Sequence, residues 1–128
     1  MAAAALAAVM EAVEVTTVVE AANLLIVVLA AAGVDLVMNA RGAEALEASA
    51  QAIRDAHGVE VATLTADVTT QQGQNSLLEA AGQVDILVTN AGGPPPGLWS
   101  DWDRDDFIRA LDANMLTPIA LMKALLPE

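Results

Sequence analysis

The regular alternation of β-branched runs with longer amphipathic segments between residues 34 and 89 constrains the fold of this chain most strongly. The pattern predicts strands at residues 34–39, 59–66 and 84–89, and helices at residues 43–56 and 71–81. Strands joined through helices within one sheet run parallel, because each helix returns the chain to the end of the sheet at which the previous strand began. Such crossover connections are almost always right-handed. We therefore expect an α/β domain in which helices cover a small parallel sheet.

The first 32 residues are dominated by Ala and Val and give weaker signals. Residues 2–10 are nearly pure Ala, which favours a helix. Residues 13–19 are rich in β-branched side chains and predict a fourth strand, although the same residues would also continue a helix. Residues 21–32 predict a helix that ends at Gly33, where glycine suits a left-handed cap.

The last third of the chain predicts a loop followed by one long helix. Residues 90–102 contain glycines and prolines in close succession, which indicates a loop. Asp103 is a suitable N-cap for the helix, and its apolar stripe continues to Leu125. Pro118 is expected to kink this helix. We expect a single domain over residues 1–128, atypical in its first 32 residues.

Composition excludes several classes of function. Acidic residues outnumber basic residues by 17 to 5, and a formal net charge of −12 repels nucleic acids and anionic membrane surfaces. The chain has no Cys and a single His, which excludes disulfides, thiolate chemistry and metal sites built from Cys or His clusters. No signal peptide is apparent, and the apolar run at residues 24–32 is too short to span a bilayer. A cytoplasmic location without a membrane partner is expected.

Four short motifs follow the predicted elements in a fixed order. They are Asn39-Ala40-Arg41, Asp67-Val68, Asn90-Ala91-Gly92-Gly93, and Asn114 in the long helix. In this order, residues 34–127 resemble the first half of a short-chain dehydrogenase/reductase, and especially the 3-oxoacyl carrier protein reductases. The resemblance implies a Rossmann-like three-layer α/β/α half domain and NADP-dependent reduction of a 3-oxoacyl or other keto substrate.

The resemblance implies that the residue after the second family strand selects the cofactor. Family members that prefer NAD carry an acid where this chain has Ala40, and that acid binds the ribose 2′-hydroxyl. Arg41 would instead bind a 2′-phosphate through its guanidinium group, so NADP is the implied cofactor. The residue alone is equally consistent with a solvated cation at a helix start.

Two further motifs match cofactor-binding positions of the family. Asp67 and Val68 correspond to the pair that brackets adenine, although an Asp at a strand end is also a common helix cap. Asn90, Ala91 and Gly92 correspond to the motif in which glycine lets the backbone approach the cofactor.

Asn114 corresponds to a catalytic position of the family. There, an Asn of the long helix helps to hold a water in the proton relay of a Ser-Tyr-Lys-Asn set. The alternative is a polar residue on the flank of a helix. Asn has poor helix propensity, which favours the functional interpretation.

Two departures from the family pattern argue against catalysis by this chain alone. The glycine-rich phosphate-binding turn is expected at residues 14–22, where the sequence has no glycine and carries Glu14 and Glu20. The sequence also reaches Glu128 before the family's catalytic Ser and Tyr-x-x-x-Lys positions, and it contains no Tyr. Carbonyl reduction would then lack its general acid.

Three hypotheses of function follow. The chain is part of an NADP-dependent oxidoreductase whose other half comes from another chain, or it is a non-catalytic α/β module that self-associates. A third hypothesis makes its Ala/Val-rich start an anchor for a membrane or partner. The exposed face of the long C-terminal helix and an open sheet edge predict a homo-oligomer.

Overall fold

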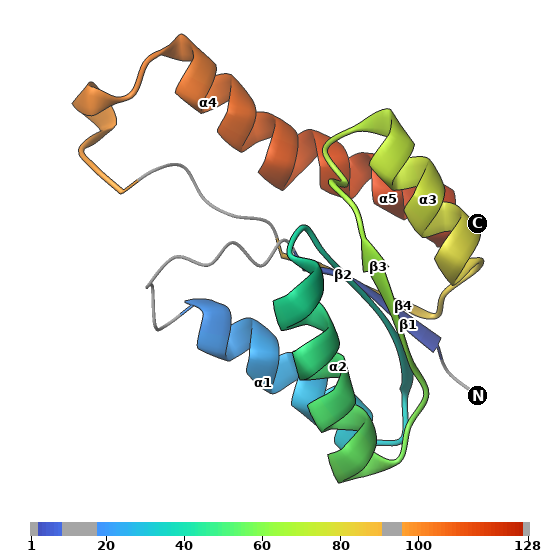
Figure 1. The fold of residues 1–128 in the computed structure, drawn as a ribbon. Coiled ribbons are helices and arrows are strands. Elements are labelled where there is room, and N and C mark those ends of the chain that lie inside the picture. Colours follow the sequence, from blue (N-terminus) through green and yellow to red (C-terminus); the bar gives the residue numbers. More distant parts are fainter. Residues whose placement is uncertain (1–2, 9–17, 91–95, 127–128) are drawn as a thin grey trace.

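A computed structural model describes residues 3–8, 18–90 and 96–126 of the chain. The described residues form a parallel sheet whose strands are β1 (Ala3–Ala8), β2 (Asp35–Ala40), β3 (Val61–Thr65) and β4 (Ile86–Asn90). Helices α1 (Val18–Ala31) and α2 (Ala43–His57) lie on one face of this sheet. Helix α3 (Gln71–Ala81) and the C-terminal helical segment lie on the other face (Figure 1). The expected Rossmann-like three-layer α/β fold with a small parallel sheet is confirmed.

The strands lie in the order β3-β2-β1-β4. β1 is therefore internal, and its Ala5 pairs with Val37 on one side and Leu87 on the other. The chain first builds outward from β1 through β2 to β3 and then returns to place β4 on the opposite side. In open α/β sheets, ligands bind beyond the carboxyl ends of the strands at such a reversal.

The N-terminal predictions need correction. Residues 3–8 form strand β1 and not a helix, because ladders to β2 and β4 on both sides outweigh the helical preference of alanine. Of the strand predicted at residues 13–19, residues 13–17 lie outside the described residues. Val18 and Val19 belong to helix α1. The fourth strand thus lies about ten residues earlier than expected, while α1 ends before Gly33 as predicted, with a positive φ of 81°.

The elements between residues 35 and 90 match their predictions to within one or two residues. Gly58 caps α2 in the left-handed conformation, and its N–H donates to the Arg54 carbonyl. Glycine is unfavourable inside a helix, but Gly73 of α3 has a structural reason: a Cβ there would lie 1.8 Å from the carbonyl oxygen of Asp67. The first turn of α3 therefore packs directly against the backbone that leaves β3.

The predicted long helix has three parts: α4 (Arg104–Leu111), a π-helical turn (Asp112–Leu116) and α5 (Thr117–Leu125). Asp103 caps α4 as predicted, and its side chain accepts a hydrogen bond from the Asp106 N–H. The kink at Pro118 stays a prediction. A π turn lies directly before α5, and in it the Thr117 N–H donates to the Asp112 carbonyl five residues earlier. Figure 1 shows α4 projecting beyond the strands while α5 lies beside α3.

Two apolar clusters hold the layers together, one on each face of the sheet. The larger joins α1 and α2 to β2 and β3 through Ile26, Ala30, Leu36, Met38, Ala40, Leu46, Ala50, Ile53 and Val61. The smaller joins α3 and α5 through Val68, Leu77, Val84, Leu121 and Leu125. Each fully buried Leu contributes about 1.5–3 kcal/mol. The smaller cluster includes Val68 and so connects the core directly to the turn after β3.

Candidate functional site

Three of the predicted site residues lie at or just after the carboxyl ends of strands, on the same side of the sheet. Arg41 follows β2, Asp67 follows β3, and Asn90 is the last residue of β4. The register brings these strand ends level, since Ala40 pairs with Thr65 and Ala8 pairs with Asn90. Ala91 and Gly92 of the third motif lie outside the described residues. The candidate site is therefore the side of the sheet at which the carboxyl ends of the parallel strands lie, which we call the carboxyl edge.

Asp67 is held by the turn that joins β3 to α3. Its carboxylate accepts hydrogen bonds from the Thr69 N–H at 3.0 Å and from the Thr69 hydroxyl at 2.6 Å. The hydroxyl bond is the main cause that lowers the pKa of Asp67, and the positive charge of Arg41 lowers it further. Asp67 is therefore a carboxylate at neutral pH, and it shares the edge with the Arg41 guanidinium.

The helix-cap alternative for Asp67 does not apply. The N-cap of α3 is Thr70, whose hydroxyl oxygen accepts a hydrogen bond from the Gly73 N–H at 3.0 Å. Asp67 instead forms a local turn with Thr69, which leaves its carboxylate in front of the helix.

Val68 is buried, and its side chain packs in the smaller apolar cluster with Leu77 and Leu121. Its carbonyl oxygen accepts a hydrogen bond from the Gln74 side chain at 3.0 Å. These contacts fix the turn after β3 to helix α3. The side chain of Val68 is therefore part of the smaller apolar cluster.

A residue that the sequence did not single out as functional, Asn39, lies beneath this edge. It is completely buried, and its side-chain nitrogen donates to the carbonyl oxygens of Leu64 at 2.9 Å and Ala66 at 3.2 Å. In the sequence, Asn39 is an amide that directly follows the apolar residues Leu36, Val37 and Met38 and begins the Asn39-Ala40-Arg41 motif. Among the described residues, the side-chain oxygen of Asn39 has no hydrogen-bond partner.

Asn114 lies in the π turn, on a different element from the other site residues. Its side-chain nitrogen donates to the Ala110 carbonyl at 3.0 Å, and the residue is exposed. This bond to the preceding turn is the one that a polar residue on a helix flank commonly makes. A role in a proton relay stays a prediction.

The segment expected to bind the pyrophosphate also changes position. The connection from β1 to α1 covers residues 9–17, not residues 14–22, because residues 18–22 already belong to α1. Residues 9–17 lie outside the described residues, but their sequence contains no glycine and includes Glu11 and Glu14. The departure from a glycine-rich sequence therefore holds for the shifted segment as well.

Within the part of the chain that the structure describes, no group of His, Asp or Glu is arranged to hold a metal ion. In the same residues, no helix combines the length and apolar character needed to cross a membrane.

Two solved structures that share this fold are complexes with a nicotinamide cofactor or its derivative. L-Sorbose reductase from Gluconobacter frateurii, complexed with NADPH and L-sorbose, matches 97% of this chain with a TM-score of 0.79 at 21% identity. An alcohol dehydrogenase from the archaeon Thermococcus sibiricus, complexed with 5-hydroxy-NADP, matches 97% of the chain with a TM-score of 0.74 at 24% identity. The matches cover 46% and 51% of those chains, so they show a shared fold over about half of each protein.

Sequence comparison extends the likeness beyond the fold. The chain is 38% identical over 105 residues to dehydrogenase/reductase SDR family member 7B from Bos taurus. It is 30% identical over 95 residues to 3-dehydrosphinganine reductase TSC10A from Arabidopsis thaliana. These matches cover 75% and 74% of this chain but only 32% and 29% of the two relatives. The profile of the short chain dehydrogenase family matches residues 23–128, and the chain therefore belongs to that family of oxidoreductases.

Proposed function

We propose that this chain supplies the adenine end of an NADP site to an oxidoreductase and does not transfer hydride by itself. The proposal rests on the positions of Arg41 and Asp67, which follow the neighbouring strands β2 and β3 at the carboxyl edge. There the positive charge of Arg41 helps to lower the pKa of Asp67. In the proposed site, Asp67 accepts from the exocyclic amine of adenine and the Val68 backbone lies beside the ring.

Preference for NADP over NAD follows from the residues at the end of β2. Ala40 is buried and neutral, so no carboxylate is present there to bind a ribose 2′-hydroxyl or to repel a 2′-phosphate. Arg41 is exposed immediately before α2, and no side chain caps the first N–H groups of that helix at Gly42. A guanidinium group beside open helical N–H groups favours a phosphate dianion.

Hydride transfer needs groups that these residues do not provide. Reduction of a carbonyl requires a general acid to protonate the developing alkoxide, and the chain has no Tyr. Lys123 lies exposed in the last turn of α5, and Asn114 alone does not supply a proton. We assign a keto substrate, including the 3-oxoacyl class, only to an assembled enzyme. The names of two relatives, reductases of 3-dehydrosphinganine and of L-sorbose, describe ketones and support this class.

Calorimetric titration with NADPH and NADH tests the cofactor preference. We expect NADPH to bind at least about tenfold more tightly, which corresponds to about 1.4 kcal/mol. Arg41→Ala should abolish the difference, whereas Arg104→Ala, which removes an exposed Arg from α4, should preserve it. Equal affinities for NADPH and NADH, or a preference that survives Arg41→Ala, would refute the proposal. Rapid NADPH oxidation by the purified chain with a keto substrate would refute its catalytic part.

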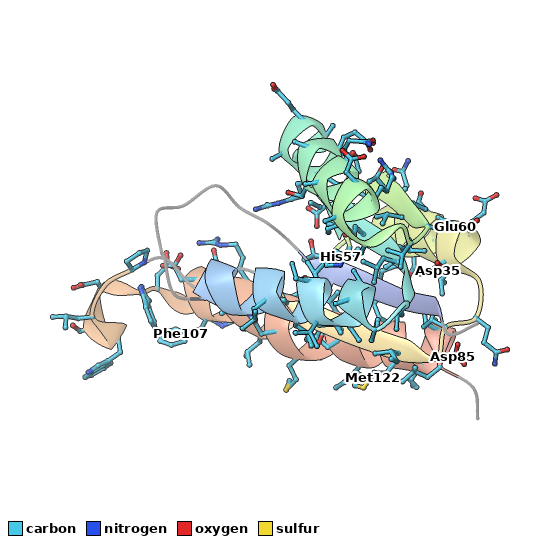
Figure 2. The ribbon with its side chains drawn as sticks, turned by 90° about the horizontal axis from the view of Figure 1, so that it is seen from below. Asp35, His57, Glu60, Asp85, Phe107 and Met122 are labelled. Carbon is cyan, nitrogen blue, oxygen red and sulfur yellow. The ribbon has the colours of Figure 1, made fainter. Side chains whose placement is uncertain are left out.

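A specific surface favours the second candidate, a module that self-associates through the C-terminal helical segment. Five apolar residues spaced three or four apart, each 43–51% exposed, follow one another along this segment: Ile108, Leu111, Met115, Ile119 and Met122. We call these five residues the helical stripe; they lie on α4, on the π turn and on α5. Exposed apolar residues of this kind on helices pack against a second helix. Figure 2 labels Met122 on α5 and Phe107, a further exposed apolar residue, on α4.

The sheet edges are consistent with association of copies of the chain. At the β3 edge, the Arg54 guanidinium donates twice to the Val61 carbonyl, at 3.0 and 2.6 Å, and pairs with Glu47. An occupied carbonyl and a charged pair disfavour strand addition there. On this reading the β4 edge and the helical stripe form the contact between copies, and the chain acts as a cytoplasmic homo-oligomer.

Sedimentation equilibrium tests this candidate. The unaltered chain should form a dimer or larger species, and Leu111→Glu together with Met115→Glu should make it monomeric. Leu24→Glu is the control, because Leu24 is also an exposed apolar residue, 64% exposed, but lies on α1. A monomeric unaltered chain, or dissociation by the control alone, would contradict the self-association.

A further inference from the structure

We infer that Asn39 is a positioning residue for the adenine end of the site, because its side chain fixes the end of β3 from which Asp67 departs. This inference rests on the proposed function, since it assigns a purpose to the position of Asp67. Asn39 is the first residue of the Asn39-Ala40-Arg41 motif, but the resemblance gives it no cofactor-binding role. Both of its side-chain hydrogen bonds are to backbone carbonyls at the end of β3 and just after it.

The two hydrogen bonds of Asn39 bracket the last residue of β3. One side-chain nitrogen donates to the carbonyls of Leu64 and Ala66, on either side of Thr65. The Ala66 N–H also donates to the Ala40 carbonyl at 3.1 Å. Consecutive residues of β2 thus hold both the carbonyl and the N–H of Ala66, the residue directly before Asp67.

The opposite side of Asp67 is held by helix α3. The Asp67 carbonyl accepts from the Thr70 hydroxyl at 2.8 Å and from the Thr70 N–H at 3.2 Å. Gly73 approaches the same carbonyl so closely that no Cβ fits between them. Asp67 therefore lies between a support on β2 and a support on α3. Its position along the edge depends on both.

Only Asn meets the requirements at residue 39. The site is completely buried and needs a short side chain with two donors on one atom. Asp has the same shape but only accepts, so it would place a carboxylate against two carbonyl oxygens. Leu would leave both carbonyls without this donor. The side-chain oxygen has no partner among the described residues, which works against stability. The amide is therefore explained by the turn that it holds rather than by packing.

Carbon-detected NMR titration of the carboxyl groups tests this inference without any cofactor. In Asn39→Leu and Asn39→Asp, the pKa of Asp67 should rise toward its ordinary value as the Thr69 hydrogen bonds loosen. The pKa values of Glu47 and Asp103, which other contacts lower, should stay unchanged and so report that the rest of the chain is folded. Asn75→Asp, at an exposed position of α3, is the matched control.

Two further measurements keep the inference open to refutation if these variants do not fold or if the cofactor does not bind. In the unaltered chain, the side-chain amide protons of Asn39 should exchange with solvent at least about a hundredfold more slowly than those of exposed Asn75. Affinity for adenosine 2′,5′-bisphosphate should fall at least about tenfold in a folded Asn39 variant. Fast Asn39 exchange, or an unchanged Asp67 pKa in a folded variant, would overturn the inference. Failure of the unaltered chain to bind the bisphosphate would refute only the proposed function.

Discussion

Gly73→Ala should destabilise this protein, although the same change in most helices is stabilising. Alanine gains about 1 kcal/mol over glycine within a helix. Here the new Cβ would lie 1.8 Å from the Asp67 carbonyl oxygen and 2.5 Å from its carbonyl carbon. To reach ordinary van der Waals distance, α3 and the turn after β3 would have to separate by about 1.6 Å.

Overpacking of this kind costs about 1–3 kcal/mol, and more where backbone must move. Both contacts are with backbone and Thr70 also lies close, so no flexible side chain can relieve them. We therefore expect a net loss of about 2 kcal/mol in the free energy of unfolding, after the gain in helix propensity. Urea denaturation followed by circular dichroism measures this loss through the midpoint at an unchanged slope.

Asn75→Ala is the matched control, because it adds helix propensity in the same helix at an exposed position. It should raise the stability by a few tenths of a kcal/mol. If Gly73→Ala were as stable as the unaltered chain, the close approach of α3 to Asp67 would be wrong. The account of how this turn is held would then fail with it.

Two further predictions concern the same region. Thr69→Val removes the hydroxyl that lowers the pKa of Asp67, so it should destabilise the protein at neutral pH. A lowered carboxyl pKa contributes stability above the unfolded-state pKa and loses it as pH falls through the folded-state pKa. The difference between the two proteins should therefore vanish in acid; a difference independent of pH, in denaturation series at several pH values, would contradict this cause. Leu121→Ala should cost about 2–5 kcal/mol, because Leu121 is 1% exposed in the smaller apolar cluster. A loss below 1 kcal/mol by urea denaturation would mean that α5 does not pack on α3 as described.

The alternating part of the fold was predictable because its signals are local. Residues 35–90 show period-two and helical patterns separated by residues that suit turns and caps, such as Gly58 and Thr70. The helix cap at Asp103 was predictable for the same reason. Each of these signals depends on neighbours within a few positions along the chain.

The strand at residues 3–8 could not be predicted in this way. Alanine favours a helix, and the strand exists because β2 and β4, distant in sequence, offer ladders on both sides. Val18 and Val19 show the opposite case, since β-branched residues that suit a strand begin helix α1. In both places tertiary pairing outweighs intrinsic preference.

The candidate site was partly predictable. The motifs at Arg41, Asp67 and Asn90 identified the carboxyl edge, because parallel strands bring their ends together. The contribution of Asn39 was hidden, since its partners lie 25 and 27 residues further along the chain. The need for glycine at residue 73 was hidden as well, because the carbonyl that requires it belongs to the turn before the helix.

NMR titration of the unaltered chain with adenosine 2′,5′-bisphosphate tests the central claim most directly. This probe carries the adenine and the 2′-phosphate but not the nicotinamide, so it does not depend on a complete catalytic site. The account predicts saturable shifts of the amide signals at residues 41–43 and 67–69, larger than those produced by adenosine 5′-monophosphate. Absence of saturable shifts, or shifts confined to other residues such as those around Lys123, would contradict an adenine and phosphate site at this edge of the sheet.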